Sequence, residues 1–482
     1  MRVLAIDQGT SSTKALVVDD DGSVIAQQQV EVRPRALTDG GVEQDPEELW
    51  KSVLTAGNAA LADSGTDVDA VALANQGETV LCWDRATGTP LADALVWQDR
   101  RATGICERLA ADGWSERLSA LTGLELDPYF VAPKIAWLRE HVTRDGVATT
   151  TDTWLLHRLC GAFVTDAATA SRSLLLDLDE VRWSDEACEA FDLDPAELPE
   201  VVPCTDTVGE TDVFGDVSLP VVGLAVDQQA ALFAEACLAT GEAKCTYGTG
   251  AFLLATAGSS ALRSTNGLVA CVAWQVRDKD RAPETTYCLD GQVYTVGAAV
   301  TWLIALGLID EPADLDHVGG NASDAGGTTF VPGLAGLAAP FWKPNAHGAF
   351  TGLSLSTDRG NLVRAVIDGI AAQCAWLALA AGNDLGSPVL RLRVDGGLTR
   401  SHLLMQTQAD LLQAPVEVYA SPDATALGVA AFARLGSGAA SSAADAVGAW
   451  EPAAVYEPQI STDEAEARLA SWRRAADATM DL

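Results

Sequence analysis

Apolar runs of strand length alternate with polar turns and helical segments along the whole chain. The first run, RVLAIDQG, is followed by the polar turn GTSSTK and a second run, ALVVDDDG. Residues 243–258, AKCTYGTGAFLLATAG, repeat this order of strand, Gly/Thr turn and strand. Two copies of one such unit predict a duplicated fold with two similar lobes, and the cleft between them is the expected ligand site.

Helical patterns fill the spaces between these strands. Asp45 and Pro46 suit the N-cap and first turn of a helix whose apolar face carries Leu49, Val53 and Leu54. Further along, we expect a core helix over 299–309, a loop over 331–344, a helix over 361–381, a strand over 390–397 and a helix over 399–413. This alternation predicts an α/β fold.

A polar break at residues 75–79 interrupts the apolar stretch VALANQGETVLCWD, residues 71–84. A hairpin would explain it, because glycine tolerates positive φ and turns are polar. The alternative is a ligand site at the carboxyl end of a buried strand, where open α/β sheets bind their substrates. Taken alone, the stretch favours the hairpin.

Composition indicates an ordinary globular protein. With 482 residues, 48% of them apolar and 20% charged, the chain is too long for one hydrophobic core. No apolar run approaches the roughly 20 residues of a membrane span, and the N-terminus lacks the apolar core of a signal peptide. Ten cysteines without a C-x-x-C pair argue against a disulfide framework or a zinc site. We therefore expect a soluble, cytoplasmic protein.

The net charge of −36 narrows the choice of partners. Such a surface repels nucleic acid phosphates and anionic lipid, so neither nucleic acid nor a membrane is an expected partner. The sequence leaves open whether the acidity reflects a salty habitat, and whether the chain forms a homodimer or homotetramer.

The turn DQGTSSTK, residues 7–14, has the composition of a phosphate-binding loop. Backbone N–H groups in such a turn form a concavity for anions, hydroxyls add hydrogen bonds and Lys14 adds positive charge. Asp7, at the end of the strand, is suited to hold Mg²⁺ through water. A polar hairpin is the alternative, but TYGTG at 246–250 repeats the same chemistry.

Two further strand ends carry candidate chemistry. Asp227 follows the apolar strand PVVGLAV and is either a helix N-cap or the carboxylate that accepts a hydroxyl proton during phosphoryl transfer. Gly396 and Gly397 follow the strand RLRVD, where glycine lets the backbone approach a flat ligand such as a nucleotide base. A tight turn explains the two glycines equally well.

Together these motifs resemble the FGGY carbohydrate kinases, within the sugar kinase, Hsp70 and actin superfamily. DQGTSSTK, the GTG turn at 248–250, AVDQQAALF and RVDGGLTRSHLLMQ occur in the order and spacing of that family. The sequence is most similar to the glycerol kinases, through stretches that include NQGETVLCWDRATGTPLADALVWQDRR (75–101), LDPYFVAPKIAWL (126–138), DTWLLHRLCG (152–161) and ASRSLLLDL (170–178). The likeness extends from residue 3 to about 435.

The resemblance implies two actin-like (ribonuclease H-like) lobes with ATP and Mg²⁺ in the cleft between them. The N-terminal lobe, residues 1–242, would hold the substrate and the first phosphate loop, and the C-terminal lobe, residues 243–482, the nucleotide. The reaction implied is transfer of the γ-phosphate to a terminal hydroxyl of a small polyol or sugar.

The resemblance also assigns roles to residues. Asp227 corresponds to the general base, with Asp7 beside it as the second catalytic carboxylate. The substrate positions are Gly77, Glu78, Trp97, Tyr129, Asp227, Gln228 and Phe252. The nucleotide positions are Thr10, Ser11, Ser12, Lys14, Thr249, Gly250, Gly297, Thr301, Gly396, Gly397 and Ser401. Lys14 stands where glycerol kinases usually carry arginine, and Thr301 and Ser401 stand where the family commonly has Gln and Asn.

One departure bears on the substrate. Glycerol kinases read N-Q-R-E-T where this chain reads N-Q-G-E-T, so Gly77 replaces an arginine that donates to the glycerol hydroxyls. Such buried charged donors contribute about 1.5 to 3 kcal/mol each, and their loss would weaken glycerol binding by about tenfold or more. The missing guanidinium would also vacate volume for an additional carbon or two.

The leading hypothesis is an ATP-dependent kinase that phosphorylates glycerol. The alternative, motivated by Gly77, is a kinase for a four- or five-carbon polyol or ketose such as erythritol or xylulose. A non-catalytic actin-like sensor is a third hypothesis, against which the retention of Asp7, Glu78 and Asp227 argues.

Overall fold

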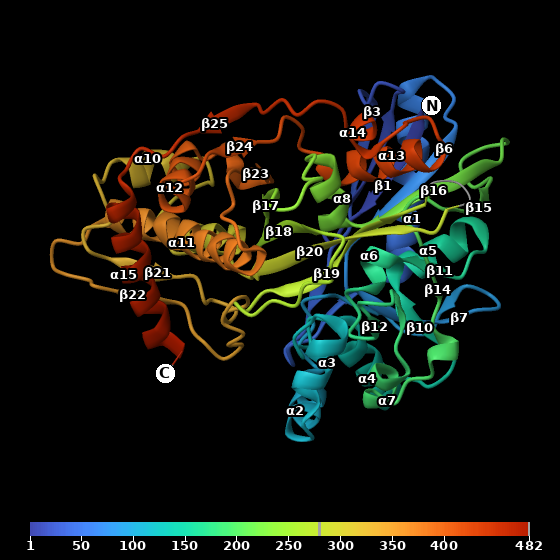
Figure 1. The fold of residues 1–482 in the computed structure, drawn as a ribbon, viewed down its shortest axis with the longest axis horizontal. Coiled ribbons are helices and arrows are strands. Elements are labelled where there is room, and N and C mark those ends of the chain that lie inside the picture. Colours follow the sequence, from blue (N-terminus) through green and yellow to red (C-terminus); the bar gives the residue numbers. More distant parts are fainter. Residues whose placement is uncertain (278–280, 481–482) are drawn as a thin grey trace.

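The computed structural model describes residues 1–277 and 281–480. Two lobes, each built on a mixed β-sheet, lie side by side, with the N-terminal lobe at the right of Figure 1 and the C-terminal lobe at the left. This is the duplicated α/β arrangement that the two strand–turn–strand units predict.

The N-terminal sheet has the strand order β15-β16-β6-β1-β2-β3. Strand β1 pairs antiparallel with β2 and parallel with β6, which is parallel to β16 on its other side. The strands are β1 (Val3–Gln8), β2 (Ser12–Val18), β3 (Val24–Glu31), β6 (Ala70–Asn75), β15 (Thr207–Thr211) and β16 (Leu219–Val226). Every residue of β6 is buried, as expected for a strand with helices on both faces.

The C-terminal sheet repeats this pattern. Its order is β19-β20-β18-β17-β23-β24-β25, with β17 antiparallel to β18 and parallel to β23. The strands are β17 (Ala243–Tyr247), β18 (Ala251–Gly258), β19 (Val269–Val276), β20 (Glu284–Val293), β23 (Leu392–Asp395), β24 (Val416–Val418) and β25 (Ala454–Tyr456). The predicted duplication is confirmed, because β1–β2–β6 and β17–β18–β23 have equivalent pairings.

A second, smaller sheet completes the N-terminal lobe. Its order is β10-β7-β9-β5-β4, with β8 paired to β7. The strands are β4 (Arg35–Ala36), β5 (Val42–Gln44), β7 (Val80–Asp84), β8 (Thr89–Pro90), β9 (Ala94–Leu95) and β10 (Val147–Thr150). Three two-stranded sheets are formed by β11 (Val164–Asp166) with β14 (Glu200–Val202), β12 (Leu176–Asp177) with β13 (Arg182–Trp183), and β21 (Thr329–Val331) with β22 (Ala349–Thr351).

Helices cover these sheets. Those that precede β17 are α1 (Pro46–Ser64), α2 (Thr103–Ala111), α3 (Trp114–Thr122), α4 (Val131–His141), α5 (Thr151–Cys160), α6 (Ala167–Ala170), α7 (Asp185–Ala190) and α8 (Asp227–Ala234). Those that follow it are α9 (Gly297–Ala305), α10 (Asp314–Gly320), α11 (Arg359–Leu385), α12 (His402–Leu412), α13 (Ala424–Gly436), α14 (Ala443–Val447) and α15 (Thr462–Met480). Short 3₁₀ helices occupy Pro195–Glu197 and Gly397–Arg400.

Several helix boundaries differ from the sequence prediction. Asp45 caps α1 as expected, because its side chain accepts a hydrogen bond from the Glu47 N–H. The helix predicted over 399–413 begins later, since Ser401 is extended and caps α12 by accepting from the Leu404 N–H. α11 runs longer than predicted, from Arg359 to Leu385. By length and composition α11 could cross a membrane, but 72% of its most apolar window is buried within the protein.

Helix α13 joins the two halves of the chain. Although it follows the C-terminal sheet in sequence, it packs against α8, β16 and β1, and Figure 1 shows it, in red, beside the blue strands of the N-terminal lobe. Its buried residues, such as Val429 and Phe432, share one hydrophobic core with Val3 and Phe233. The division at residue 242 stays a prediction, and this core crosses it.

Candidate active site

The stretch NQGET forms the connection between two different sheets. Strand β6 ends at Asn75 between β1 and β16, whereas β7 pairs with β10, β8 and β9. The hairpin interpretation is therefore wrong. The stretch lies at the carboxyl end of a buried strand, as the alternative requires, and its role as a ligand site stays a prediction. The Gln76 N–H donates to the Gln8 carbonyl at 2.8 Å, which ties the connection to the end of β1. Glu78 has a φ of 56°, a left-handed conformation that non-glycine residues adopt at a cost and that is common in ligand sites.

A cavity of about 360 Å³ lies between the lobes at this point. All the predicted substrate residues line it, namely Gly77, Glu78, Trp97, Tyr129, Asp227, Gln228 and Phe252. Trp97 meets Tyr129 and Phe252 edge to face, with ring centroids 5.8 and 6.0 Å apart. The Trp97 indole N–H donates to Thr10 Oγ1 at 2.9 Å, which links this aromatic wall to the first phosphate loop.

Arg172 and Asp290 also line this cavity, and the sequence reasoning did not single them out. The Arg172 guanidinium donates from Nε to Glu78 at 2.6 Å and from Nη1 to Asp290 at 2.5 Å. All three side chains are almost completely buried. Burial alone would lower the pKa of Arg172, but Asp290 and Glu78 together raise it well above its usual value. Arg172 lies in ASRSLLLDL (170–178), a stretch that resembles the glycerol kinases, so the sequence contained a signal for it. Asp290 is one of 67 acidic residues and lies in none of the motifs, so no signal distinguished it.

One carboxylate oxygen in the cluster of Glu78, Arg172 and Asp290 is available to accept a hydrogen bond from a ligand. Asp290 Oδ1 is buried and has no hydrogen-bond partner among the residues that the structure describes. Burial raises the pKa of both Asp290 and Glu78, while Arg172 opposes the rise. A buried acceptor without a partner is costly, so a ligand hydroxyl that donated to it would be well stabilised.

Lys134 fixes the segment that carries Tyr129. It is fully buried, and its ammonium donates to the carbonyls of Pro128, Tyr129 and Phe130 just before α4. Burial lowers the pKa of Lys134 to about 7. Three carbonyls held by one side chain give the Tyr129 ring a defined position in the cavity wall.

Asp227 is the first residue of α8, at the end of β16. Its Oδ1 accepts a hydrogen bond from the Gln228 N–H at 2.7 Å. Burial, with the nearby charges of Asp7 and Glu78, raises its pKa to about 7, and Lys244 opposes the rise. A carboxylate with a pKa near neutrality is suited to accept a proton from an alcohol.

Asp7 and the first phosphate loop lie beside Asp227. Burial raises the pKa of Asp7 to about 6, against the lowering effect of Lys14. The turn is closed by the Gly9 N–H and the Ser12 carbonyl at 3.0 Å, and Thr10 and Ser11 line the substrate cavity.

Three residues predicted for this loop, Asp7, Ser12 and Lys14, are absent from the lining of both cavities. Ser12 already belongs to strand β2. Lys14 follows it on β2 and pairs with Asp423 at 2.8 Å, so its ammonium is engaged with the residue that precedes α13. Their roles toward a nucleotide stay predictions.

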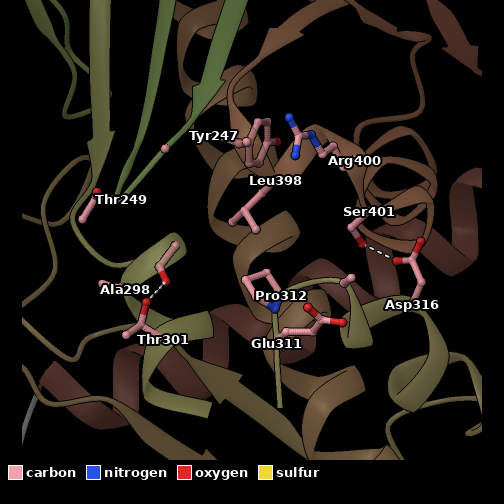
Figure 2. Close-up of a pocket in the computed structure, with 14 residues that line it drawn as sticks. Tyr247, Thr249, Ala298, Thr301, Glu311, Pro312, Asp316, Leu398, Arg400 and Ser401 are labelled. Carbon is pink, nitrogen blue, oxygen red and sulfur yellow. Dashed lines mark hydrogen bonds between the residues drawn. The ribbon is translucent and has the colours of Figure 1, made fainter. Parts of the chain in front are cut away.

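A larger cavity of about 830 Å³ lies in the C-terminal lobe. Its lining, shown in Figure 2, comes from the end of β17, the start of α9, the segment before α10 and the segment 397–401. The predicted residues Thr249, Gly297, Thr301, Gly397 and Ser401 are among them. The Thr301 hydroxyl donates to the Gly297 carbonyl, and the Ser401 hydroxyl to Asp316.

Gly250 and Gly396 are absent from the lining of both cavities, and close backbone packing accounts for them. A Cβ on Gly250 would lie 2.5 Å from the Val293 carbonyl oxygen. Gly396 has a φ of 95°, and a Cβ there would lie 2.5 Å from the Tyr247 carbonyl oxygen. Both glycines let strand ends converge beneath the larger cavity, and any contact with a nucleotide stays a prediction.

Gly248 and Thr249, in the turn between β17 and β18, line both cavities. The two cavities therefore meet at the second phosphate loop. A ligand in the larger cavity that extended across this junction would reach the part of the smaller cavity lined by Thr10, Ser11 and Asp227.

The sequence predicts empty volume beside Gly77, but a neighbouring side chain occupies part of it. A Cβ on Gly77 would lie 2.9 Å from Cγ2 of Val226, which also lines the substrate cavity. The space that the missing arginine was expected to vacate is thus occupied in part by a valine from the neighbouring strand.

Comparisons with known proteins agree with this geometry. The N-terminal domain of the FGGY family of carbohydrate kinases matches residues 2–234, and its C-terminal domain matches residues 243–436. The chain is 41% identical to a glycerol kinase of Bordetella parapertussis, over 98% of this chain and 96% of that protein. It is 40% identical to a glycerol kinase of Saccharopolyspora erythraea, over 99% of both.

Solved structures are similar over almost the whole chain. The Plasmodium falciparum glycerol kinase with ADP superposes with a TM-score of 0.91 and 30% identity, covering 99% of this chain and 98% of that one. A xylulose kinase from Lactobacillus acidophilus superposes with a TM-score of 0.87 over 100% of this chain and 97% of that one, and at 20% identity it supports the fold alone.

Proposed function

Because the chain belongs to the FGGY family of carbohydrate kinases, we propose that it transfers the γ-phosphate of ATP to a terminal hydroxyl of a small polyol, with glycerol as the first candidate. The observation that carries the proposal is the meeting of the two cavities at Gly248 and Thr249, beside Asp227. The likeness to a glycerol kinase solved with ADP supports a nucleotide in the larger cavity.

The reaction would run across the junction of the cavities. Asp227 accepts the proton of the terminal hydroxyl, the hydroxyl oxygen forms a bond to the γ-phosphorus, and the bond to the bridging oxygen of ADP breaks. Backbone N–H groups and hydroxyls of the two turns, at Thr10, Ser11 and Thr249, would stabilise the charge on the phosphoryl oxygens. Asp227 then releases its proton to solvent.

Mg²⁺ is the proposed metal. Among residues 1–277 and 281–480, no group of three or more His, Cys, Asp or Glu side chains could hold a metal ion. That suits Mg²⁺, which binds through one or two carboxylates, phosphate and water. Asp7 is the candidate carboxylate, because it lies close enough to Asp227 for their charges to interact and precedes the turn at Gly9. The ion would neutralise charge on the transferred phosphate.

The acceptor substrate would bind in the smaller cavity. Glu78, Gln228 and the free Oδ1 of Asp290 offer polar partners for hydroxyls, while Trp97 and Phe252 offer apolar surface for the carbon chain. Glycerol is favoured by the likeness to glycerol kinases at about 40% identity. A four- or five-carbon polyol or ketose remains the second candidate, because Gly77 removes a donor for glycerol.

A substrate panel tests the proposal. Glycerol, erythritol, threitol, ribitol, xylitol, xylulose and ribulose are supplied at equal concentration with Mg²⁺-ATP, and ADP release is measured. Phosphorylation of at least one, abolished in Asp227→Asn, is the expected result. Release of ADP that does not depend on any of these acceptors would contradict the proposal.

We also propose a cytoplasmic location, supported by ten cysteines of which none is in a disulfide within the described residues. Assembly as a homodimer or homotetramer stays a prediction.

A further inference from the structure

The backbone conformation at position 77 does not require glycine. In the connection between β6 and β7, the positive φ belongs to Glu78, whereas Gly77 is outside the left-handed region. An L-residue could therefore adopt this conformation. The restriction is steric, since a Cβ at this position would lie 2.9 Å from Val226 Cγ2, well inside the 3.5 to 4.0 Å at which carbon atoms pack.

Val226 occupies a central place in the active site. It is the last residue of β16, it is 2% exposed, and it directly precedes Asp227. Strand β16 is parallel to β6, with Val226 in register with Asn75. Side chains at positions 77 and 226 thus compete for one space at the edge of the substrate cavity.

We propose that Val226 determines the specificity for the phosphate acceptor, by filling with an apolar group the space that a side chain at position 77 would otherwise enter. This inference rests on the proposed kinase function. A valine offers no hydrogen-bond donor, so this edge of the cavity favours the C–H surface of a substrate over a hydroxyl. Glycerol is the first candidate from the likeness to glycerol kinases, whereas this contact favours the second candidate, a four- or five-carbon polyol or ketose, whose longer chain can place carbon against Val226 and still reach the polar groups of Glu78 and Asp290.

A kinetic cycle tests the proposal. Gly77→Arg, Val226→Ala and the double variant are compared with the parent, using glycerol and the four- and five-carbon acceptors. Because alanine lacks the obstructing Cγ2, we expect the double variant to lower KM for glycerol by about tenfold or more relative to the parent. Gly77→Arg alone should not lower it, and Val226→Ala alone should raise KM for the larger acceptors.

The matched control is Val222→Ala. Val222 is a buried residue of the same strand and is absent from the lining of the cavity. Combined with Gly77→Arg, it should leave the glycerol KM as it is in Gly77→Arg alone. Equal rescue by the Val222 and Val226 variants, or no coupling between positions 77 and 226, would overturn the proposal.

A second cycle measures the contact without activity. The unfolding midpoint is determined for Gly77→Ala, Val226→Ala and the double variant. We expect Gly77→Ala to lower the midpoint in the parent and to have little effect once Val226 is alanine. Additive shifts would mean that the two positions do not share a space.

The two cycles separate the possible failures. If the parent phosphorylates no acceptor of the panel, the proposed function fails, while the unfolding cycle still decides whether the contact exists. If the parent is an active kinase and its kinetic cycle is additive, the function stands and the role of Val226 is wrong.

Discussion

The two cavities of the active site are built by different means. The substrate cavity draws charged side chains from both lobes, with Glu78, Arg172 and Asp290 almost completely buried. The cavity proposed for the nucleotide is more than twice as large, and residues 247–401 of the second half of the chain form all of its lining. Its charged residues are exposed or half-buried, namely Glu311, Asp316 and Arg400. Single substitutions should therefore matter far more in the first cavity than in the second.

The largest effect is expected at Asp227. Asp227→Asn keeps the shape of the side chain but removes the group that accepts the hydroxyl proton, so kcat should fall about 100- to 10,000-fold. Steady-state ADP release at saturating acceptor measures it. A variant with the parent kcat would mean that another group is the base.

Arg172→Met should have the next largest effect. It leaves Glu78 and Asp290 buried without their shared cation, and breaking a buried ion pair lowers the free energy of unfolding by about 3 to 5 kcal/mol. Denaturant unfolding measures the loss. The control is Arg277→Met, which breaks the more exposed pair with Asp206 and should cost about 1 kcal/mol or less.

The pH dependence tests the electrostatics of the substrate cavity. Because Asp227 must be a carboxylate to act as a base and its pKa is raised to about 7, kcat/KM should rise with pH and level off above that value. Lys244 lowers this pKa, so Lys244→Met should move the rise to higher pH. A rise centred near pH 4 in the parent would contradict the raised pKa of Asp227.

The smallest effect is expected in the nucleotide cavity. The Thr301 hydroxyl already donates to the Gly297 carbonyl within its own helix, so Thr301→Ala should raise KM for ATP by about threefold or less. Initial rates at varied ATP measure this. An increase in KM for ATP of about 100-fold, which corresponds to about 3 kcal/mol, would remove the contrast between the cavities.

Sequence patterns predicted those parts of the site that lie at strand ends. The duplicated strand–turn–strand units located the two turns that line the cavities, whose binding of phosphate stays a prediction, and the polar breaks after apolar runs located Glu78 and Asp227. These features depend on residues close together in the chain, where the period of the apolar residues and the residue types of the turns indicate the local structure. The resemblance to a family then gave them roles.

Contacts between distant segments could not be predicted in this way. Arg172 reaches Glu78, 94 positions earlier, and Asp290 in the other half of the chain. The meeting of Gly77 with Val226 also depends on two strands being neighbours in the sheet. Lys14 is predicted at the phosphates from its charge and from the family resemblance, but the sequence could not show that its ammonium pairs with Asp423, 409 positions later.

Helix α13 has a consequence for how the protein can be divided. Its residues 424–436 complete the core of the N-terminal half, so a fragment that stops at residue 242 would leave the surfaces of β1, β16 and α8 uncovered. Exposed apolar surface of that kind promotes aggregation. The N-terminal half therefore cannot reach its final packing during synthesis until residues 424–436 have left the ribosome.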